Sequence, residues 1–237
     1  MITPSIVHVP GRNRLLDLLP EADLARLLPA MERVSCKLGD LVFERNSPIR
    51  IIDFPLGAVV SIVVMMEDGE TVEAGVVGNE GMTGAPLVLG TQQSLNRAFY
   101  QAPGESLRMS ARTFQEEMNR KGRFHDIMHR YVQAFLAQVA QSAACNRLHP
   151  VEQRLCRWIL MSHDRVGREE LVLTQEVMAQ MLGVRRASVS VVAAMLRKAG
   201  FISYTRGVIS IRDRAGLEAS ACECYAAVRA ETARLLS

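Results

Sequence analysis

The chain lacks any apolar run close to the roughly 20 residues that a membrane-spanning helix requires. Its first residues contain no apolar segment of the kind found in signal peptides, and low-complexity tracts are absent from the sequence. These absences argue against a membrane, secreted or fibrous protein. What remains is a chain of 237 residues, 49% of them apolar, which is enough for two modest domains with packed cores. We expect a soluble cytoplasmic protein that does not bind a membrane.

A disulfide framework is also lacking, because the five cysteines are odd in number and irregularly spaced. Only Cys36 lies in the first hundred residues, so an amino-terminal iron–sulfur centre with four cysteine ligands is excluded. Cys222 and Cys224 could ligate a metal or respond to oxidation. We expect them on different faces of a helix, and no further Cys or His follows them. The sequence therefore predicts no metal and no cofactor, and leaves a redox role of Cys222 and Cys224 open.

The net charge of +3 is small, but its distribution is uneven. Residues 151–214 contain eleven basic and six acidic side chains, an excess of about five positive charges, so the remainder is slightly acidic. A basic module on a nearly neutral body indicates a polyanionic partner.

Residues 34–109 contain short runs rich in Val, Ile and Phe, separated by Gly, Pro, Asn and Asp. Asp68-Gly69 lies between two of these runs and predicts a hairpin, because such a turn requires positive φ. Several short strands at nearly regular spacing indicate a barrel or a sandwich. The predicted strands are Leu41–Phe43, Ile49–Phe54, Val59–Met65, Val72–Val77, Ala98–Gln101 and Ser106–Met109.

Gly and Pro then become rare, and residues 124–144 predict one long helix. Its apolar stripe needs a cover, which a second copy of the chain could supply by dimerisation along the helix. The alternative is that the stripe packs onto the chain's own β domain. The residues predicted for the dimer interface are Ile127, Tyr131, Ala134, Phe135 and Gln138.

The stretch that follows Thr174 predicts a helix-turn-helix. Thr174 can cap the first helix, Ala179 is small where two helices would cross, and Gly183 allows the left-handed turn between them. The second helix has a buried face at helical spacing, formed by Val189, Val192, Ala193 and Leu196.

The outer face of the second helix is basic near its amino end, where a recognition helix meets base edges in the major groove. The hairpin that follows has Arg206-Gly207 at its tip, as expected of a wing that contacts phosphate. Protein contact is the alternative role of such a domain. No catalytic arrangement is recognisable, so we do not expect an enzyme. The predicted DNA-binding residues are Arg185, Arg186, Ser188 and Ser190 in the groove, with Thr174, Gln175 and Arg206 on the backbone.

The order of β domain, long helix and winged helix-turn-helix resembles the Crp/Fnr superfamily, which includes the cyclic AMP receptor protein. The resemblance rests on IIDFPLGAVVSIVVMMEDGETVEAGVVGNEGMTG and on LTQEVMAQMLGVRRASVSVVAAMLRKAGFI. It implies an α+β chain with a cyclic-nucleotide-binding-like β-roll (jelly-roll), a long dimerisation helix and a winged helix-turn-helix. It also implies a homodimer that reads a palindromic operator in double-stranded DNA and contacts RNA polymerase. The expected domain ranges are 1–122, 123–148 and 149–237.

The sequence departs from the family where cyclic AMP binders hold ribose and phosphate. The region of their Gly-Glu pair contains Gly84-Ala85-Pro86, and the arginine of their Arg-Ser/Thr-Ala triplet is displaced to Asn96-Arg97-Ala98. A shift of one residue in a strand turns a side chain to the opposite face. We place an effector pocket at Gly84, Asn96 and Arg97, the positions that correspond to the family's ligand-binding residues. Because the arginine is displaced and the glutamate is missing, we expect an effector other than cyclic AMP. The alternative function is a ligand-binding signalling module whose helical domain contacts proteins rather than DNA.

Overall fold

The computed structural model describes residues 11–236. Its amino-terminal part is built from two antiparallel sheets, with strand orders β1-β7-β3 and β2-β6-β4-β5. The main core lies between them and contains Ile52 and Phe54 from the first sheet and Val60 and Tyr100 from the second. The strands are β1 (Glu32–Cys36), β2 (Leu41–Phe43), β3 (Ile51–Pro55), β4 (Val59–Met65), β5 (Thr71–Val77), β6 (Arg97–Ala102) and β7 (Gly104–Ser110).

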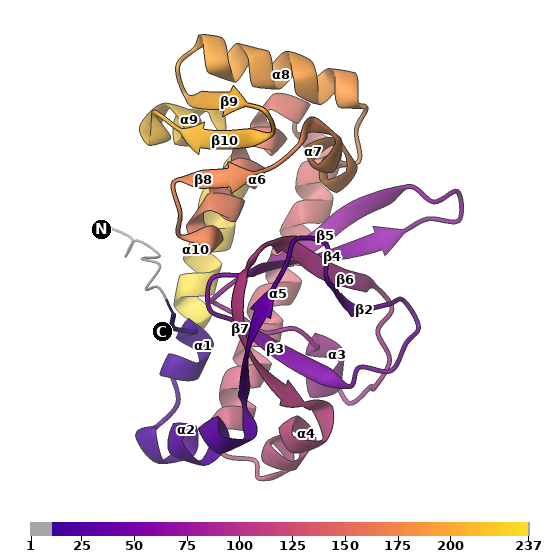
Figure 1. Ribbon diagram of the computed structural model, residues 1–237, viewed down its shortest axis with the longest axis vertical. Coiled ribbons are helices and arrows are strands. Elements are labelled where there is room, and N and C mark those ends of the chain that lie inside the picture. Colours follow the sequence, from indigo (N-terminus) through magenta and orange to yellow (C-terminus); the bar gives the residue numbers. More distant parts are fainter. Residues whose placement is uncertain (1–10, 237) are drawn as a thin grey trace.

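Strand β4 is apolar on both faces because the four-stranded sheet is covered on both sides. Val60 and Ile62 point into the core between the sheets, whereas Val59 and Val63 belong to a second core shared with the carboxy-terminal part. The predicted hairpin at Asp68-Gly69 joins β4 to β5, with Gly69 at φ +86°. This hairpin projects beside the carboxy-terminal domain (Figure 1).

Short helices flank the sheets. The side chain of Asn13 accepts hydrogen bonds from the backbone N–H groups of Leu15 and Leu16, and the Ser110 hydroxyl accepts one from Thr113. Both residues thus satisfy backbone donors that a helix start leaves free. The helices are α1 (Arg14–Asp17), α2 (Glu21–Leu27), α3 (Ala85–Val88) and α4 (Ala111–Asn119), with a 3₁₀ turn at Leu28–Ala30.

Helix α5 (Arg123–Leu148) runs through the middle of the molecule (Figure 1). Its apolar stripe packs onto the chain's own β domain. This is the alternative considered above, and it corrects the assignment of the stripe to a dimer interface. The exposed side of α5 includes Leu136, of which 53% is accessible. The stripe residues enclosed within one chain are Ile127, Tyr131, Ala134 and Gln138, which are buried, and Phe135, which is partly buried.

Two glycines of the segment after β5 are required by the helices that lie against it. A Cβ atom at Gly81 would lie 2.4 Å from the ring of Tyr131 in α5, and one at Gly78 would lie 2.6 Å from the Arg165 side chain in α6. Such distances leave no room for any larger residue. The glycines therefore let the segment touch both helices directly.

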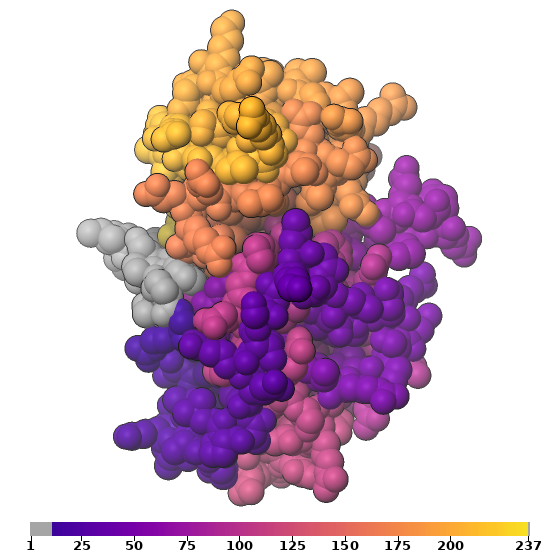
Figure 2. Space-filling view, viewed as in Figure 1, coloured from indigo at the N-terminus to yellow at the C-terminus, as the bar shows by residue number. Residues whose placement is uncertain are grey.

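The carboxy-terminal domain follows at His149-Pro150 and forms one end of the molecule (Figure 2). Helix α6 (Val151–Val166) packs on the outer face of the four-stranded sheet through the second core. A three-stranded sheet, in the order β8-β10-β9, completes the domain. Its other elements are β8 (Glu170–Val172), α7 (Gln175–Leu182), α8 (Arg186–Lys198), β9 (Ile202–Thr205), β10 (Val208–Ile211) and α9 (Arg214–Ser220).

The last segment does not continue as one helix. It breaks after α9, and α10 (Cys224–Leu235) packs along α5, so that Leu236 joins the core of the β domain. Cys222 lies in the connection and Cys224 begins α10, which corrects the expectation that both cysteines occupy one helix. Within residues 11–236, no helix is both long and apolar enough to cross a bilayer.

Candidate nucleic-acid interface and adjoining pocket

Helices α7 and α8 are held at a fixed angle by a short turn. The Thr174 hydroxyl accepts a hydrogen bond from the backbone N–H of Val177 at 3.2 Å and so begins α7. Gly183 ends α7 in the left-handed conformation, with φ +60°. Helix α8 begins three residues later, which gives the compact helix-turn-helix that the sequence predicts.

One face of α8 is anchored in the domain core, as predicted. Val189, Val192, Ala193 and Leu196 are all buried, and three of them belong to the second core. This packing directs the remaining side chains of α8 outward.

The outward face of α8 combines positive charge with small apolar groups. Arg185 and Arg186 are exposed at its amino end, and Arg197 and Lys198 are exposed at its carboxyl end. Between them Val191 is 61% accessible, which is high for an apolar side chain. We had not predicted Val191, because the pattern alone does not tell an exposed valine from a buried one.

The polar residues predicted for this face do not all point outward. The Ser190 hydroxyl donates to Gln175 Oε1 at 2.5 Å, so it links α8 to the first turn of α7. Ser188 is half-buried. Gln175 and Ser190 therefore support the helix pair. Arg185 and Arg186 remain exposed, and Arg186 Nε lies 4.0 Å from Glu176 Oε2 on the surface.

The wing stands next to this face. β9 and β10 are joined by Arg206 and Gly207, which have φ values of +51° and +81°. Two residues with positive φ form the tight hairpin turn that matches the twist of the strands. Arg206 is exposed at the tip, where the sequence predicts it.

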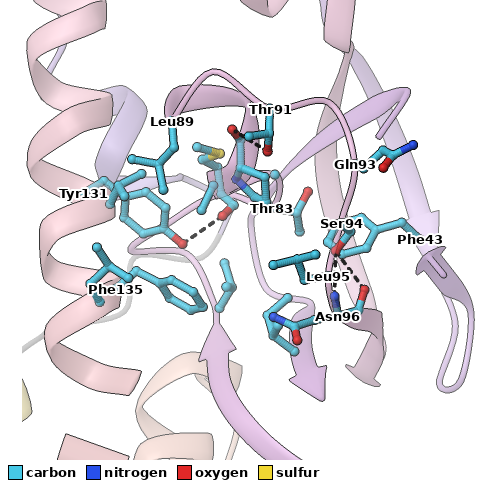
Figure 3. Close-up of a pocket in the computed structure, with 18 residues that line it drawn as sticks. Phe43, Thr83, Leu89, Thr91, Gln93, Ser94, Leu95, Asn96, Tyr131 and Phe135 are labelled. Atoms are coloured by element: carbon cyan, nitrogen blue, oxygen red, sulfur yellow. Dashed lines mark hydrogen bonds between the residues drawn. The ribbon is translucent and has the colours of Figure 1, made fainter. Parts of the chain in front are cut away.

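A largely apolar cavity of about 350 Å³ lies between the β domain and α5 (Figure 3). Helix α5 contributes Tyr131, Phe135 and Leu136, and the Tyr131 hydroxyl donates a hydrogen bond to the carbonyl of Met82 at 2.8 Å. The segments on the opposite side contribute Gly84, Leu89, Ser94, Leu95 and Asn96.

Among the described residues, no charged side chain lines this cavity. Gly84 and Asn96 are part of its wall, as predicted, but Arg97 is not. Arg97 extends from the other face of β6, where its Nε lies 3.2 Å from Glu44 Oε1. The assignment of Arg97 to the pocket is therefore corrected, since alternation along the strand turns it away.

Buried polar contacts join β5, the segment after it and α5 to α6. Glu73 Oε1 accepts a hydrogen bond from Trp158 at 2.8 Å, and Glu80 Oε1 accepts one from Arg165 at 2.7 Å. Arg165 also donates to Gln138 of α5 at 3.3 Å. Sequence reasoning missed this network, because its members are separated by up to 85 positions.

These features define a winged helix-turn-helix protein whose DNA-binding-type domain is docked on a β domain, with a cavity between that β domain and α5. Residues 153–220 match the Crp-like helix-turn-helix domain family. No curated protein sequence matches the chain.

Solved structures match most of the chain in fold. FixK2 from Bradyrhizobium japonicum superposes with a TM-score of 0.67 and 11% identity, over 81% of this chain and 98% of that chain. The c-di-GMP responsive regulator CLP from Xanthomonas campestris has a TM-score of 0.65 and 15% identity, over 81% and 99%. TTHB099, a CRP-family regulator from Thermus thermophilus, has a TM-score of 0.65 and 20% identity, over 81% and 96%.

Residues 153–220 thus form a Crp-like helix-turn-helix domain, and the chain shares its fold with solved structures of CRP- and CRP/FNR-family regulators, which confirms the predicted resemblance at the level of this domain and of the fold.

Proposed function

We propose that this protein is a sequence-specific transcription regulator that binds a palindromic operator in double-stranded DNA as a homodimer. The observation that carries the proposal is the exposed, basic amino end of α8 on a Crp-like helix-turn-helix. A recognition helix of this kind enters the major groove with its amino-terminal residues against base edges.

Within this interface, Arg185 and Arg186 are the base-reading groups, because a guanidinium can donate two hydrogen bonds to guanine. Ser188 lies beside them, and Ser190 supports the face through its bond to Gln175. Exposed Val191 provides the apolar surface that recognises a thymine methyl group. On the backbone we place Thr174, Gln175 and Arg206, the last at the tip of the wing.

The homodimer uses the exposed side of α5. The proposed seam consists of five exposed residues spaced alternately by three and four positions, as in two packed helices: Gln133, Leu136, Ala140, Ala143 and Arg147. Small side chains at two of these positions allow the helices to approach closely. The residues from Ile127 to Gln138 that the sequence predicts for the interface then lie on the opposite side of α5, where they fix the helix to the β domain.

The effector, where one acts, is an uncharged and mainly apolar molecule bound in the cavity. A cyclic phosphate buried there would have no charge partner among the lining residues, which is costly in a mostly apolar site. Leu136 lines the cavity and also belongs to the proposed seam, so a ligand bound in the cavity would affect the dimer contact.

The domain ranges 1–122, 123–148 and 149–237 then correspond to sensing, dimerisation and DNA binding. We propose RNA polymerase as the protein partner and the cytoplasm as the location, with no catalytic role.

The test is selection of bound sequences from random duplex DNA, followed by affinity measurements at several salt concentrations. We expect a palindromic sequence, and a fall in affinity of about a thousandfold or more between 50 and 200 mM salt, as several phosphate contacts require. Absence of an enriched sequence, together with salt-independent binding, would favour the signalling module that contacts proteins.

A further inference from the structure

Four side chains with metal-binding chemistry meet at the junction between α5 and α10. Cys145 lies in the last turns of α5, His149 follows that helix, and Cys222 and Cys224 flank the start of α10. One donor atom from each residue lies within 4.8 Å of every other. All three thiols are buried, and the imidazole is partly buried.

The spacing of these atoms fits a single tetrahedral ion. The sulfur atoms of Cys145 and Cys222 are 3.5 Å apart, and Cys224 Sγ lies 3.6 Å from His149 Nδ1. Zinc bonds of about 2.3 Å to sulfur and 2.0–2.1 Å to nitrogen separate such pairs by about 3.8 and 3.5 Å in a tetrahedron. We propose that Cys145, His149, Cys222 and Cys224 form a structural zinc site.

The neighbours of the ligands are those that such a site needs. His149 Nε2 lies 3.2 Å from Glu223 Oε1, which leaves Nδ1 directed at the thiols. A carboxylate on the second ring nitrogen is the usual partner of a metal-bound histidine, because it sets the tautomer. The side-chain amide of Gln141 donates to Cys224 Sγ at 3.0 Å, an interaction that favours a thiolate.

Two buried cations balance the charge. Arg154 and Arg157 of α6 are 7% and 4% accessible, and neither forms an ion pair with a carboxylate within residues 11–236. Burial raises the pKa of the Cys145 thiol, and the charge of Arg157 acts against that rise. Three thiolates and one Zn²⁺ carry a net charge of −1, which partly compensates two arginines that would otherwise be buried without a counter-ion.

A disulfide or an iron–sulfur cluster would explain less of this geometry than a zinc site does. A Cys145–Cys222 disulfide would need a sulfur–sulfur distance of about 2.0 Å and would leave Cys224 and His149 without a role. An iron–sulfur cluster is held mainly by four cysteines and is larger than one ion. The compact set of three thiols and one imidazole is that of a closed structural zinc site.

The site joins three segments of the chain. Cys145 belongs to the long helix and His149 to the junction that leads into the DNA-binding domain. Cys222 lies in the connection before the last helix, and Cys224 begins that helix. A bound ion therefore fixes the direction in which the DNA-binding domain leaves α5.

The first experiment measures metal in the full-length protein, purified without a metal-affinity step or chelators. We expect one zinc ion per chain, and five free thiols once the protein is unfolded under non-reducing conditions. Protein stripped of metal under reducing conditions should regain a higher melting temperature with zinc alone. With cobalt it should develop the visible bands of tetrahedral thiolate coordination.

Variants then locate the ion. Cys224→Ser and His149→Ala should lose most of the bound zinc, whereas Cys156→Ser, which alters a buried thiol outside the cluster, should keep it. The wild-type measurements decide the matter if a cluster variant fails to fold. Absence of zinc uptake by the stripped wild-type protein, iron in place of zinc, three free thiols instead of five, or full zinc binding by Cys224→Ser would each overturn the proposal.

Discussion

Glu80 and Arg165 form a buried ion pair between the two domains, with Glu80 Oε1 2.7 Å from Arg165 Nε. Glu80 follows β5, and Arg165 lies near the end of α6. Arg165 also donates to the carbonyl of Met161 and to Gln138, so the pair connects the β domain, α5 and α6 at one point.

Removing one member of this pair should be costly. We expect Arg165→Ala to lower the free energy of unfolding by about 3–5 kcal/mol, because Glu80 would remain buried and charged without a partner. Chemical denaturation measures this loss. Arg168→Ala is the matched control, since among residues 11–236 that exposed side chain makes a single long hydrogen bond, at 3.4 Å. If the double variant Glu80→Ala/Arg165→Ala loses as much free energy of unfolding as the two single variants added together, the two residues are not coupled.

Stability should also depend on pH through Glu73. Burial raises the pKa of this carboxyl above its usual value of 4.5. The contacts agree with a protonated group, because the Ser61 hydroxyl has one proton but touches both Glu73 Oε2 and Gln101 Oε1. As pH rises above about 4.5, the unfolded state loses this proton before the folded state does, so the free energy of unfolding falls.

Glu73→Gln should remove that part of the pH dependence and leave the protein at least as stable at neutral pH. Urea denaturation at a series of pH values is the measurement. Glu105→Gln, at an exposed site, should leave the change in free energy of unfolding with pH the same as in the wild-type protein. If the free energy of unfolding of Glu73→Gln still falls with rising pH as in the wild type, another group titrates.

The recognition helix gives a prediction about DNA. Arg186→Ala should weaken binding to the selected operator by about 1–3 kcal/mol and relax preference at one base position. Arg206→Ala should weaken all sequences alike and reduce the salt slope by about one. Arg112→Ala, an exposed residue of the distant α4, should change neither quantity. Uniform weakening by Arg186→Ala would make Arg186 a phosphate contact.

The proposed dimer is tested by two leucines of nearly equal exposure. Leu136 on α5 is 53% accessible, and Leu38 in the turn between β1 and β2 is 52% accessible. Leu136→Glu should shift the chain toward a monomer in sedimentation equilibrium, because the charge would lie in the seam. Leu38→Glu should leave the association constant unchanged. Equal behaviour of both variants would argue against a dimer along α5.

The cavity makes a prediction about ligands. Calorimetry should detect no binding of cyclic AMP at micromolar concentration, because Arg97 pairs with Glu44 outside the cavity. Native mass spectrometry of the purified protein should instead reveal any apolar molecule that co-purifies. Micromolar binding of cyclic AMP that is lost in Arg97→Ala would contradict this description of the pocket.

Strong local patterns predicted much of the fold. The run Val59–Met65 is β4 without any change of bounds, and the Asp68-Gly69 turn lies where its positive φ requires it. The helix-turn-helix also followed from local spacing, from the cap at Thr174 to the buried face of α8. By contrast β1 was missed, because its edge position leaves most of its side chains exposed and removes the alternation.

The remaining features depend on contacts between distant parts of the chain. An apolar stripe indicates that one side of α5 is covered. It does not tell whether the chain's own β domain or a second copy of the chain covers that side. Cys145 and Cys222 are separated by 77 positions, and only the return of α10 along α5 brings them together. Spacing in the sequence carries no information about such a meeting.

That return has a consequence for biosynthesis. Leu15 and Leu236 belong to the same core, although 221 positions separate them. At about 5–20 residues per second, a ribosome needs roughly 10–45 seconds to travel from one to the other. The first domain to emerge must therefore wait for the last helix before its core is closed, and chaperones that shield apolar surface would act on it during that interval.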